Sequence, residues 1–600
     1  MAKTYQREFS RYGETVTTET DARDHWFADS TLGQRFPAWT RGNAADVFPG
    51  PFSPLGQDLV LRRATSVGLR DGYIALGVLD HDEFEDPHAP DLFKVFGGYV
   101  YNPLSLTRIL GARMPGASPD LIDRAFFDDR DEVPPYEEQP WHVSPTHEAR
   151  LLESIAWAMS AESLPELDTD REMARAQRAQ RPPLREVSDA ALIARSRSMV
   201  PRVQQAFEDA MRVSSLASLG PGALGAICES LGEPTLSIRL LAGIEVDSSA
   251  PSRAMWELGR TARTSPTVGA AFDAGTDRVL DVLRTSAEPD ATDFVTRIEQ
   301  FLVDHGARGQ NEYDPIARSW ELQPHAALAA IDLMRRSDAA QAPHVRYAAA
   351  IAERDRVVTE IRHRVADDPE TASTFDSALR SAALFLGGRE RAKTNVVTLI
   401  NEIRVPLHEF GARLVRRGAL DDPRQVFMVN DRELDHLRHD PTALVDEIRR
   451  RWNQYRSLAE VEPLFVVNGR APRISEMVPR RDADRSRVAV GDVLTGAAGS
   501  GGVATGRARV ILDASDPFAL EPGDVLVAPQ TDPSWVPLFV SSAAVIVNVG
   551  AMGSHAMIAS RELGIPCVAS VTDATTLIPD GAIVRVDGNA GTVTLETLPA

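Results

Sequence analysis

Between about residues 145 and 460, apolar residues recur three and four positions apart in a sequence rich in Ala, Leu, Arg and Glu. Two clear examples are DFVTRIEQFLVDHG (residues 293–306) and TALVDEIRRRWNQYRSL (residues 442–458). This spacing places the apolar side chains along one face of an α-helix. The pattern predicts that the middle of the chain is a large helical region.

Residues 1–55 do not follow this period. They are polar at first and run into the segment FPGPFSPLG (residues 48–56), whose three prolines and two glycines are unfavourable inside a regular helix. We therefore expect an irregular N-terminal lead-in over residues 1–55, followed by a mainly helical domain over residues 56–470.

A third pattern begins near residue 490. The segment APRISEMVPRRDADRSR (residues 471–487) is rich in Pro, Arg and Asp, which predicts a linker over residues 471–489. Beyond it, the runs RARVIL, DVLVAP, AAVIVNV, CVASV, AIVRVD and TVTLE predict strands, and SHAMIASRELG predicts one helix. The expected fold is multidomain: a large, mainly α-helical domain and then a compact α/β domain over residues 490–600.

Length, charge and cysteine content narrow the class of protein. A chain of 600 residues is too long for one hydrophobic core, which agrees with several domains. The formal net charge of −21 disfavours nucleic acid and anionic membrane surfaces as partners. Cys228 and Cys567 are the only cysteines, and the sequence starts without an apolar signal region. We expect a cytoplasmic protein.

One uncharged run, WVPLFVSSAAVIVNVGAM (residues 535–552), is long enough to be compared with a membrane span. It contains Pro537 and Gly550, and its AAVIV core is rich in β-branched residues. These features predict a buried strand between short connections, and no membrane association.

His555 follows this predicted strand and a glycine-containing turn, and it opens the predicted helix. Free backbone N–H groups and the positive end of a helix dipole stabilise an anion at such a place. Gly553 would let the backbone approach closely, and Ser554 would cap the helix or hydrogen-bond a phosphate oxygen. A histidine at a helix start also serves simply as a capping or surface residue, so this position alone does not define a function.

The residues around His555 are more specific. The pattern GxxxSHAxIxxRELGIPxV in residues 550–568 closely resembles the phosphohistidine signature of phosphoenolpyruvate (PEP) synthases, pyruvate phosphate dikinases and rifampicin phosphotransferases. GSGGVATGRARV (residues 499–510) and APQTDPSWVPLF (residues 528–539) resemble further segments of the same domain, while Met557 departs from its usual small residue. The resemblance implies a swivelling phosphohistidine domain in which His555 carries the phosphoryl group.

The middle of the chain resembles, more loosely, the substrate domain of rifampicin phosphotransferases in HGARGQNEYD, RERAKTNVVTLINEIR, QVFMVNDREL and NGRAPRISE. Within the second of these, Arg389 and Lys393 are four residues apart and share one helix face, where two cations would grip one phosphate. The chain has only two other lysines, Lys3 and Lys94. The alternative is a solvated face in which the two cations pair with acidic neighbours such as Glu390. The resemblance implies phosphate contact.

Arg308 and Glu312 are weaker candidates for a substrate pocket, and a capped loop between two helices is an equal alternative for them. His436 and His439 are three residues apart without an HExxH-like context, so we predict no metal site.

The sequence contains no recognisable ATP-grasp domain and no PEP-handling barrel. We therefore expect the substrate-binding and phosphohistidine-carrier component of a split, ATP-dependent (dikinase-type) phosphotransferase that acts on a hydroxyl of a small molecule. The chain itself is expected to bind no cofactor, while ATP and Mg²⁺ bind a separate ATP-grasp subunit. The alternatives are a non-catalytic, phosphorylation-responsive binding or regulatory protein, and a ligand-binding scaffold in which His555 is vestigial.

Overall fold

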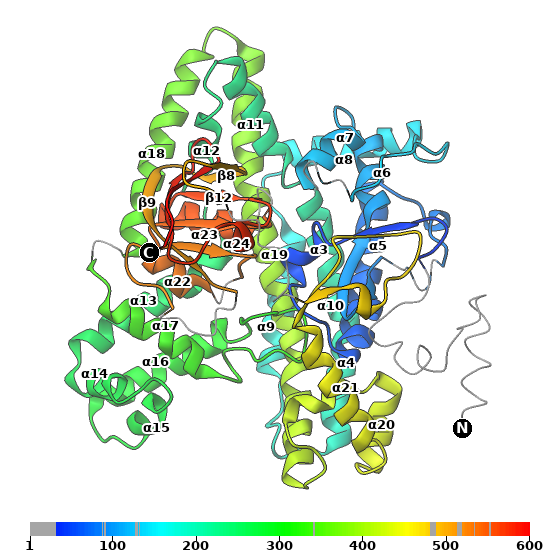
Figure 1. Ribbon diagram of the computed structural model, residues 1–600, viewed down its shortest axis with the longest axis vertical. Helices are drawn as coiled ribbons and strands as arrows, with labels where there is room; N and C mark the ends of the chain where they lie inside the picture. The colour runs from blue at the N-terminus through cyan, green and yellow to red at the C-terminus, as the bar shows by residue number, and fades with distance from the viewer. Residues whose placement is uncertain are drawn as a thin grey trace.

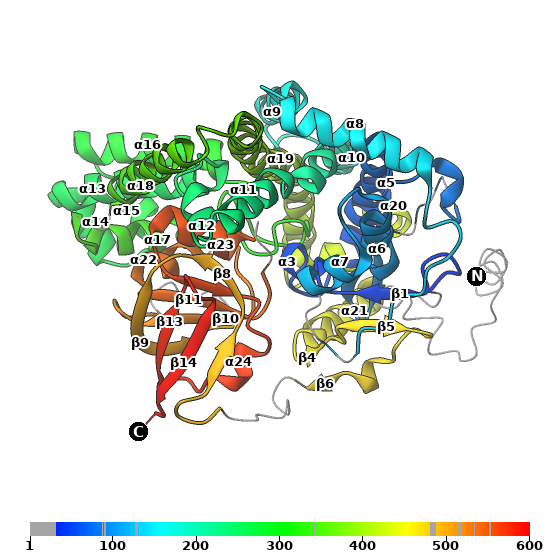
Figure 2. The same ribbon diagram turned by 90° about the horizontal axis from the view of Figure 1, so that it is seen from above.

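The computed structural model describes residues 32–599 apart from residues 87, 89, 91, 127–129, 131, 340–341, 480–487, 513–518, 533–534 and 551–553. A large helical body occupies most of the molecule, and a C-terminal domain built on a β-sheet lies against one side of it (Figure 1). Seen from above, helices α11 to α18 form a layer over that domain (Figure 2). The prediction of a mainly helical chain with a C-terminal α/β region is confirmed.

The helical body matches the stretch in which the sequence shows helical spacing. Several of its helices begin with proline in the first turn and a capping side chain before it: Ser144 accepts the N–H of His147, and Asp368 accepts that of Thr371. The helices are α8 (Pro145–Ser160), α9 (Pro165–Ala179), α10 (Asp189–Leu216), α11 (Leu219–Ser230), α12 (Leu236–Leu240), η4 (Asp247–Ser249), α13 (Ala250–Thr264), α14 (Pro266–Asp273), α15 (Val279–Arg284), α16 (Pro289–His305), α17 (Pro324–Arg336), α18 (Pro343–Arg364), α19 (Pro369–Arg416), η6 (Pro423–Met428), α20 (Asp431–His439) and α21 (Val445–Leu458).

The helix α19 is 48 residues long and forms the axis of the body. It packs against α9, α10, α11 and η6, and much of its length is buried. Close packing at one point requires glycine: a Cβ on Gly411 would clash with the carbonyl oxygen of Pro423. Because α19 is packed against other elements along its length, the backbone at Arg389 and Lys393 is held in a fixed position.

The N-terminal part of the body differs from the predicted irregular lead-in. Residues 32–55 contain β1 (Ala38–Thr40) and α3 (Ala44–Val47), and β1 joins a sheet of order β2-β3-β1-β5. The segment FPGPFSPLG was expected to be non-helical, but its last three residues begin a helix. Pro54 takes the first helical position, and Ser53 caps the helix by accepting the N–H of Gly56. The other elements here are α4 (Pro54–Gly56), η2 (Gln57–Thr65), α5 (Ser66–Leu76), η3 (His81–Glu83), β2 (Lys94–Phe96), β3 (Tyr99–Pro103), α6 (Leu104–Arg113), α7 (Pro119–Phe126), β4 (Val461–Glu462), β5 (Val466–Asn468), η7 (Ile474–Glu476) and β6 (Val478–Pro479).

The C-terminal domain contains every strand and the helix that the sequence predicted there. Its sheet has the order β7-β14-β13-β9-β10-β11-β12-β8, with β9 to β12 parallel. Only Gly496 separates β7 from β8, although these strands lie at opposite edges, so the sheet is rolled until its edges meet. The elements are β7 (Val493–Thr495), β8 (Ala497–Ser500), β9 (Val503–Val510), β10 (Val525–Ala528), α22 (Val536–Ser541), β11 (Ala544–Val547), α23 (His555–Leu563), β12 (Cys567–Ala569), α24 (Ala574–Leu577), β13 (Ile583–Asp587) and β14 (Thr592–Thr597).

The alternating side chains of the buried strands pack into two different cores. On β11, Ala544 and Ile546 point into the roll, whereas Val545 and Val547 face α22 and α23. The outer cluster continues without a break into the helical body, where it includes Trp256 of α13 and Leu328 of α17. The C-terminal domain is therefore docked on the helical body, with α22 against α17 and α23 against α18 and η4, and the apolar cluster of the interface continues into α13 and α17.

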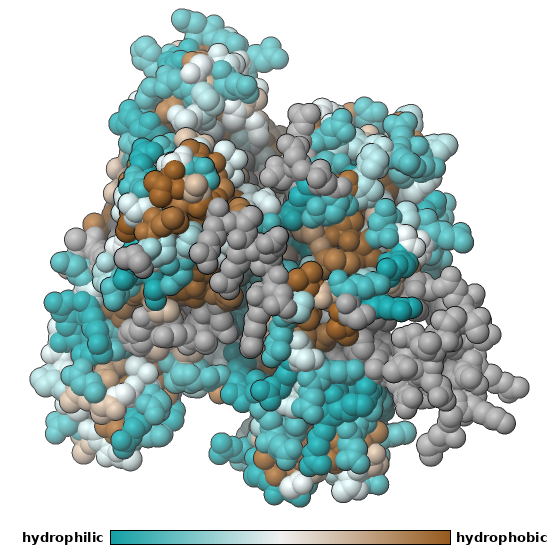
Figure 3. Space-filling model, viewed as in Figure 1, coloured by the Kyte–Doolittle hydropathy of each residue, from teal (hydrophilic) through white to brown (hydrophobic). Residues whose placement is uncertain are grey.

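The uncharged run near residue 545 contains the fully buried strand β11, as predicted, and also the short helix α22, which was not predicted. Among the residues that the structure describes, none of the helices is both long enough and apolar enough to cross a membrane. On the face shown in Figure 3, hydrophobic residues gather over the C-terminal domain, and the outermost helices are hydrophilic.

Candidate active site

His555 is the first residue of α23, directly after Ser554 at the N-cap position. The hydroxyl of Ser554 makes no capping bond and has no hydrogen-bond partner among the described residues, although Ser554 is buried. Ser554 thus occupies the N-cap position, but the predicted capping bond from its side chain is not formed. The alternative, a hydrogen bond from Ser554 to phosphate, stays a prediction. Gly553 lies outside the described residues.

The ring of His555 is held by its own domain. Its Nδ1 lies 2.9 Å from the Oγ1 of Thr531, and the ring of Phe539 packs against it edge-on at a centroid distance of 5.6 Å. The second ring nitrogen, Nε2, is separated from Nδ1 by Cε1, so the contact with Thr531 leaves it unengaged. Thr531 and Phe539 both belong to the segment APQTDPSWVPLF, so the signal for them was present in the sequence, but their roles were not predicted.

The surroundings of His555 keep its imidazole neutral. Burial at the domain interface lowers its pKa well below the usual value, and the positive charges of Lys393 and Arg308 lower it further. The structure thus brings Lys393 and Arg308, two residues of the helical body, close enough to His555 to act on its charge.

Lys393, Arg308 and Glu312 form one ion-pair group. The Nζ of Lys393 lies 3.2 Å and an Nη of Arg308 lies 3.0 Å from the same oxygen, Oε1 of Glu312. Arg308 also donates to the hydroxyl of Thr394 at 2.6 Å. Arg308 and Glu312 are only 3% and 4% exposed, whereas the side chain of Lys393 is 24% exposed. Arg404, also buried, donates to the carbonyl oxygens of Ala307 and Glu312 and fixes the loop that carries the group.

Electrostatics explain why a buried carboxylate is tolerated at this place. Burial alone would raise the pKa of Glu312, but the charges of Arg308 and Lys393 outweigh it and hold the pKa below its usual value. The other oxygen, Oε2, has no hydrogen-bond partner among the described residues. Glu312 therefore links two cations while keeping part of its hydrogen-bonding capacity unused.

Arg389 lies one turn before Lys393 on α19 and is partly exposed. Among the described residues it forms no ion pair, while Lys393 pairs with Glu312 and is also under the influence of the charge of Glu390. Both cations face Asp46 of α3: burial raises the pKa of Asp46 to about 6, against the opposing charges of Arg389 and Lys393. Asp46 was not predicted, because only the folded chain brings α3 to α19.

The described residues contain no group of three or more His, Cys, Asp or Glu side chains arranged to hold a metal ion. The site is thus an imidazole, neutral and anchored at Nδ1, beside a cluster of Arg and Lys side chains. This combination provides a nucleophilic nitrogen and cations that stabilise a phosphoryl group.

Comparisons with known proteins agree with this arrangement. Residues 520–591 match the mobile domain of PEP-utilising enzymes, and residues 209–390 match the fourth domain of rifampicin phosphotransferase. The C-terminal domain, with His555 on α23, is thus a mobile domain of the PEP-utilising class.

Relatives extend the likeness to most of the chain. The uncharacterized protein Rv2047c of Mycobacterium tuberculosis is 27% identical over 583 residues, which cover 94% of this chain and 62% of that protein. A rifampicin phosphotransferase of a Streptomyces species is 34% identical over 39% of this chain and 27% of its own length. The uncharacterized phosphotransferase YvkC of Bacillus subtilis is 25% identical over 59% of this chain and 43% of its own length. The chain therefore spans less than two thirds of these relatives, and it is similar to rifampicin phosphotransferases in its helical body and to PEP-utilising enzymes in its C-terminal domain.

Proposed function

We propose that this chain is a phosphotransferase component in which His555 carries a phosphoryl group to a hydroxyl of a small molecule bound by the helical body. The observation that carries the proposal is the position of His555: its Nδ1 is occupied by Thr531, and the ring meets the helical body where the charges of Lys393 and Arg308 reach it. The match to the PEP-utilising mobile domain and the relatives named as phosphotransferases support the same reaction class.

The proposed chemistry has two covalent steps. When Nδ1 carries the ring proton and donates it to Thr531, Nε2 keeps a lone pair. In the first step Nε2 attacks the β-phosphorus of ATP and forms a P–N bond as the P–O bond to AMP breaks, and one water then cleaves the γ-phosphate from the pyrophosphoryl group as inorganic phosphate. In the second, the acceptor oxygen forms a P–O bond as the P–N bond breaks, and the hydroxyl proton leaves to solvent or a nearby base. Overall, ATP, one water and the acceptor give AMP, inorganic phosphate and the phosphorylated acceptor.

The proposal assigns ATP and Mg²⁺ to a separate ATP-grasp subunit that charges His555. The helical body then supplies the acceptor side, where Arg389 and Lys393 stabilise the phosphoryl group during transfer. Lys393 is suited to this role because its flexible stem allows it to exchange the carboxylate of Glu312 for a phosphate oxygen.

The central test mixes the full chain with an ATP-grasp partner and ATP, and follows an acid-labile gain of one phosphoryl group by mass spectrometry. We expect the modification on His555 and its loss in His555→Ala. If the chain stays unmodified while a competent partner consumes ATP, the relay is wrong. A chain that is phosphorylated but transfers to no acceptor would instead favour the phosphorylation-responsive binding protein.

Lys393→Ala separates the two steps. We expect phosphorylation of His555 to continue, because charging does not involve α19, and transfer to the acceptor to fall by at least about a hundredfold, since the loss of a charge that stabilises a transferring group costs ~3 kcal/mol. Arg391→Ala is the matched control, because Arg391 lies on the same helix and pairs with Asp168 at 2.7 Å on the exposed side. Equal loss of both steps in Lys393→Ala would show misfolding, and unchanged transfer would remove Lys393 from the mechanism.

A further inference from the structure

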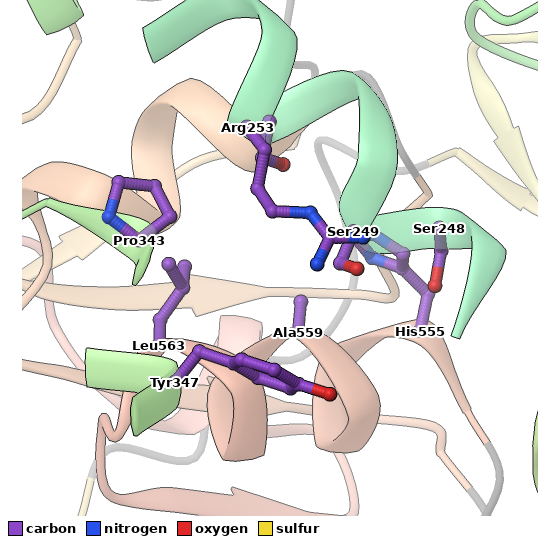
Figure 4. A pocket seen from close by; sticks show the side chains of 9 residues that line it. Ser248, Ser249, Arg253, Pro343, Tyr347, His555, Ala559 and Leu563 are labelled. Carbon is purple, nitrogen blue, oxygen red and sulfur yellow. The ribbon is translucent and has the colours of Figure 1, made fainter. Parts of the chain in front are cut away.

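A narrow recess lies beside His555 where α23 meets the helical body. The helical body lines it with Ser248 and Ser249 of η4, Ser252 and Arg253 of α13, and Tyr347 of α18. Figure 4 shows the imidazole of His555 beside Ser248 and Ser249, with the side chain of Arg253 reaching toward them from α13. These residues lie on different elements from Arg389 and Lys393.

The hydroxyl of Ser248 is unused in this recess. Ser248 is 5% exposed, and its Oγ has no hydrogen-bond partner among the described residues. Its neighbour Ser249 differs, because its hydroxyl donates to the carbonyl oxygen of Val246 at 2.8 Å. A buried hydroxyl without a partner is unfavourable unless a ligand completes its bonding. Ser248 is therefore poised to donate to a group that enters beside His555.

Arg253 brings a positive charge that is only weakly engaged. It contacts Glu245 at 3.4 Å, but Glu245 is 75% exposed, and such surface pairs contribute little. Its guanidinium lies 5.8 Å from the ring centroid of Tyr347. A guanidinium in this setting can leave its exposed partner for a phosphate, which it binds through two parallel N–H groups.

Other features of residues 245–253 also favour the binding of an anion. The carboxylate of Asp247, which directly precedes Ser248, is paired with Arg171. The first turn of the 15-residue helix α13 adds the positive end of its dipole. Gly387 allows the segment to lie close to α19, since a Cβ there would be 3.1 Å from the carbonyl oxygen of Glu245. The element η4, which lines one side of the recess, thus packs against α19.

We propose that Ser248 and Arg253 form a phosphate-binding site on the helical body, which holds the dianionic phosphoryl group of phospho-His555 while the mobile domain is docked. This inference rests on the proposed function, since it requires a phosphoryl group on His555. Ser248 donates its O–H and Arg253 its N–H groups to the phosphoryl oxygens, and no covalent bond changes. The consequence is that phosphorylation strengthens docking.

The test uses the full chain phosphorylated chemically with potassium phosphoramidate, so it needs neither a nucleotide partner nor an acceptor. Labelling of His555 is verified by phosphopeptide mapping against His555→Ala. Amide hydrogen exchange of residues 247–253 is then compared with and without the label. We expect the label to slow exchange about tenfold, Ser248→Ala or Arg253→Gln to reduce this slowing to about threefold or less, and the double variant to abolish it.

Two matched control variants make the same types of change, Ser to Ala and Arg to Gln, at residues outside the recess. Ser237→Ala removes a hydroxyl of α12 that donates to Pro234, and Arg263→Gln removes an exposed arginine of α13 that donates to Ser337. Both should keep the full slowing. The inference is overturned if the double variant keeps it too, or if phosphoramidate labels other histidines of the native chain but not His555. Failure of the relay itself is seen separately, as His555 left uncharged by the ATP-grasp partner.

Discussion

The two nitrogens of His555 have different neighbours, and this difference defines its chemistry. Nδ1 is engaged by Thr531 on the same domain, while burial and the charges of Lys393 and Arg308 keep the ring neutral. A neutral imidazole with one anchored nitrogen presents a single nucleophile.

Thr531→Val tests the anchor. Without the hydroxyl, Nδ1–H loses its partner and the ring is free to rotate, so labelling of Nε2 by phosphoramidate should slow about tenfold, and some label should appear on Nδ1. Phosphorus NMR distinguishes the two isomers. Thr531→Ser keeps the hydroxyl and should behave like the wild type. A valine variant labelled only on Nε2 at the normal rate would show that Thr531 does not orient the ring.

The depressed pKa of His555 makes a second prediction. Because the ring stays deprotonated well below pH 6.5, its rate of labelling should remain flat as the pH falls through 6.5, where an ordinary histidine becomes protonated and inert. Lys393→Met removes one of the positive charges that lower the pKa of His555. The fall in labelling rate at acidic pH should therefore begin at a higher pH than in the wild type, yet still below 6.5, since burial persists. Arg391→Gln should leave the pH of this fall unchanged. An unchanged pH of the fall in Lys393→Met would contradict the coupling between the two residues.

At this scale the sequence suggested candidate residues for the site but not the contacts between them. His555, Lys393, Arg308 and Glu312 were all predicted as candidates, and the structure brings them into one neighbourhood. Asp46 could not be predicted, because its position depends on how α3 folds back on α19.

Among the elements, α19 has the strictest packing. Its Gly411 leaves no room for a Cβ beside Pro423, whereas Gly222 of α11 has nothing within 4 Å of the place where a Cβ would lie. These two glycines occupy helices, yet only one of them is required by its surroundings.

The same substitution should therefore have opposite effects at the two sites. Gly411→Ala should lower the free energy of unfolding by ~1–3 kcal/mol, because the backbone of η6 must move. Gly222→Ala should raise it by up to ~1 kcal/mol, because alanine favours helix. Denaturant titrations of both variants measure the difference. Equal effects at the two glycines would contradict the close contact between α19 and η6.

Long elements were predictable because they repeat a period many times. The helices of the body match their period, whereas the short strand β11 was predictable from its continuous run of buried apolar residues. The strands β1 and β7 have three residues each, too few to show any alternation, and β1 is defined only by pairing with β3 and the distant β5. Residues that a sequence treats as irregular thus gain structure from partners far along the chain.

At the scale of the whole molecule, the mobile domain and the helical body share one apolar cluster. The carrier must leave this interface to reach a nucleotide on another subunit in the proposed relay. Docking therefore has to be stable enough to form a site and weak enough to open.

Ala559, which is buried on α23 where it faces the body, offers a way to shift this balance. Ala559→Glu buries a charge at the interface and should open the molecule, so its radius of gyration in small-angle X-ray scattering should increase. Phosphoramidate should label His555 at least as fast, and acceptor transfer should be lost. Thr505→Glu, on the exposed side of β9, should change neither property. A compact Ala559→Glu variant that still transfers would show that the docked interface is not used.

The hydrogen bond between Thr531 and His555 lies wholly within the mobile domain, so it travels with the ring. In the proposed relay the same nitrogen therefore accepts the phosphoryl group at the nucleotide-binding subunit and transfers it to the acceptor at the helical body. Each in-line displacement inverts the configuration at phosphorus. Transfer onto the nitrogen and transfer off it are two such displacements, so together they restore the original configuration. A phosphoryl group made chiral with oxygen isotopes would therefore reach the acceptor with the handedness it had on the nucleotide.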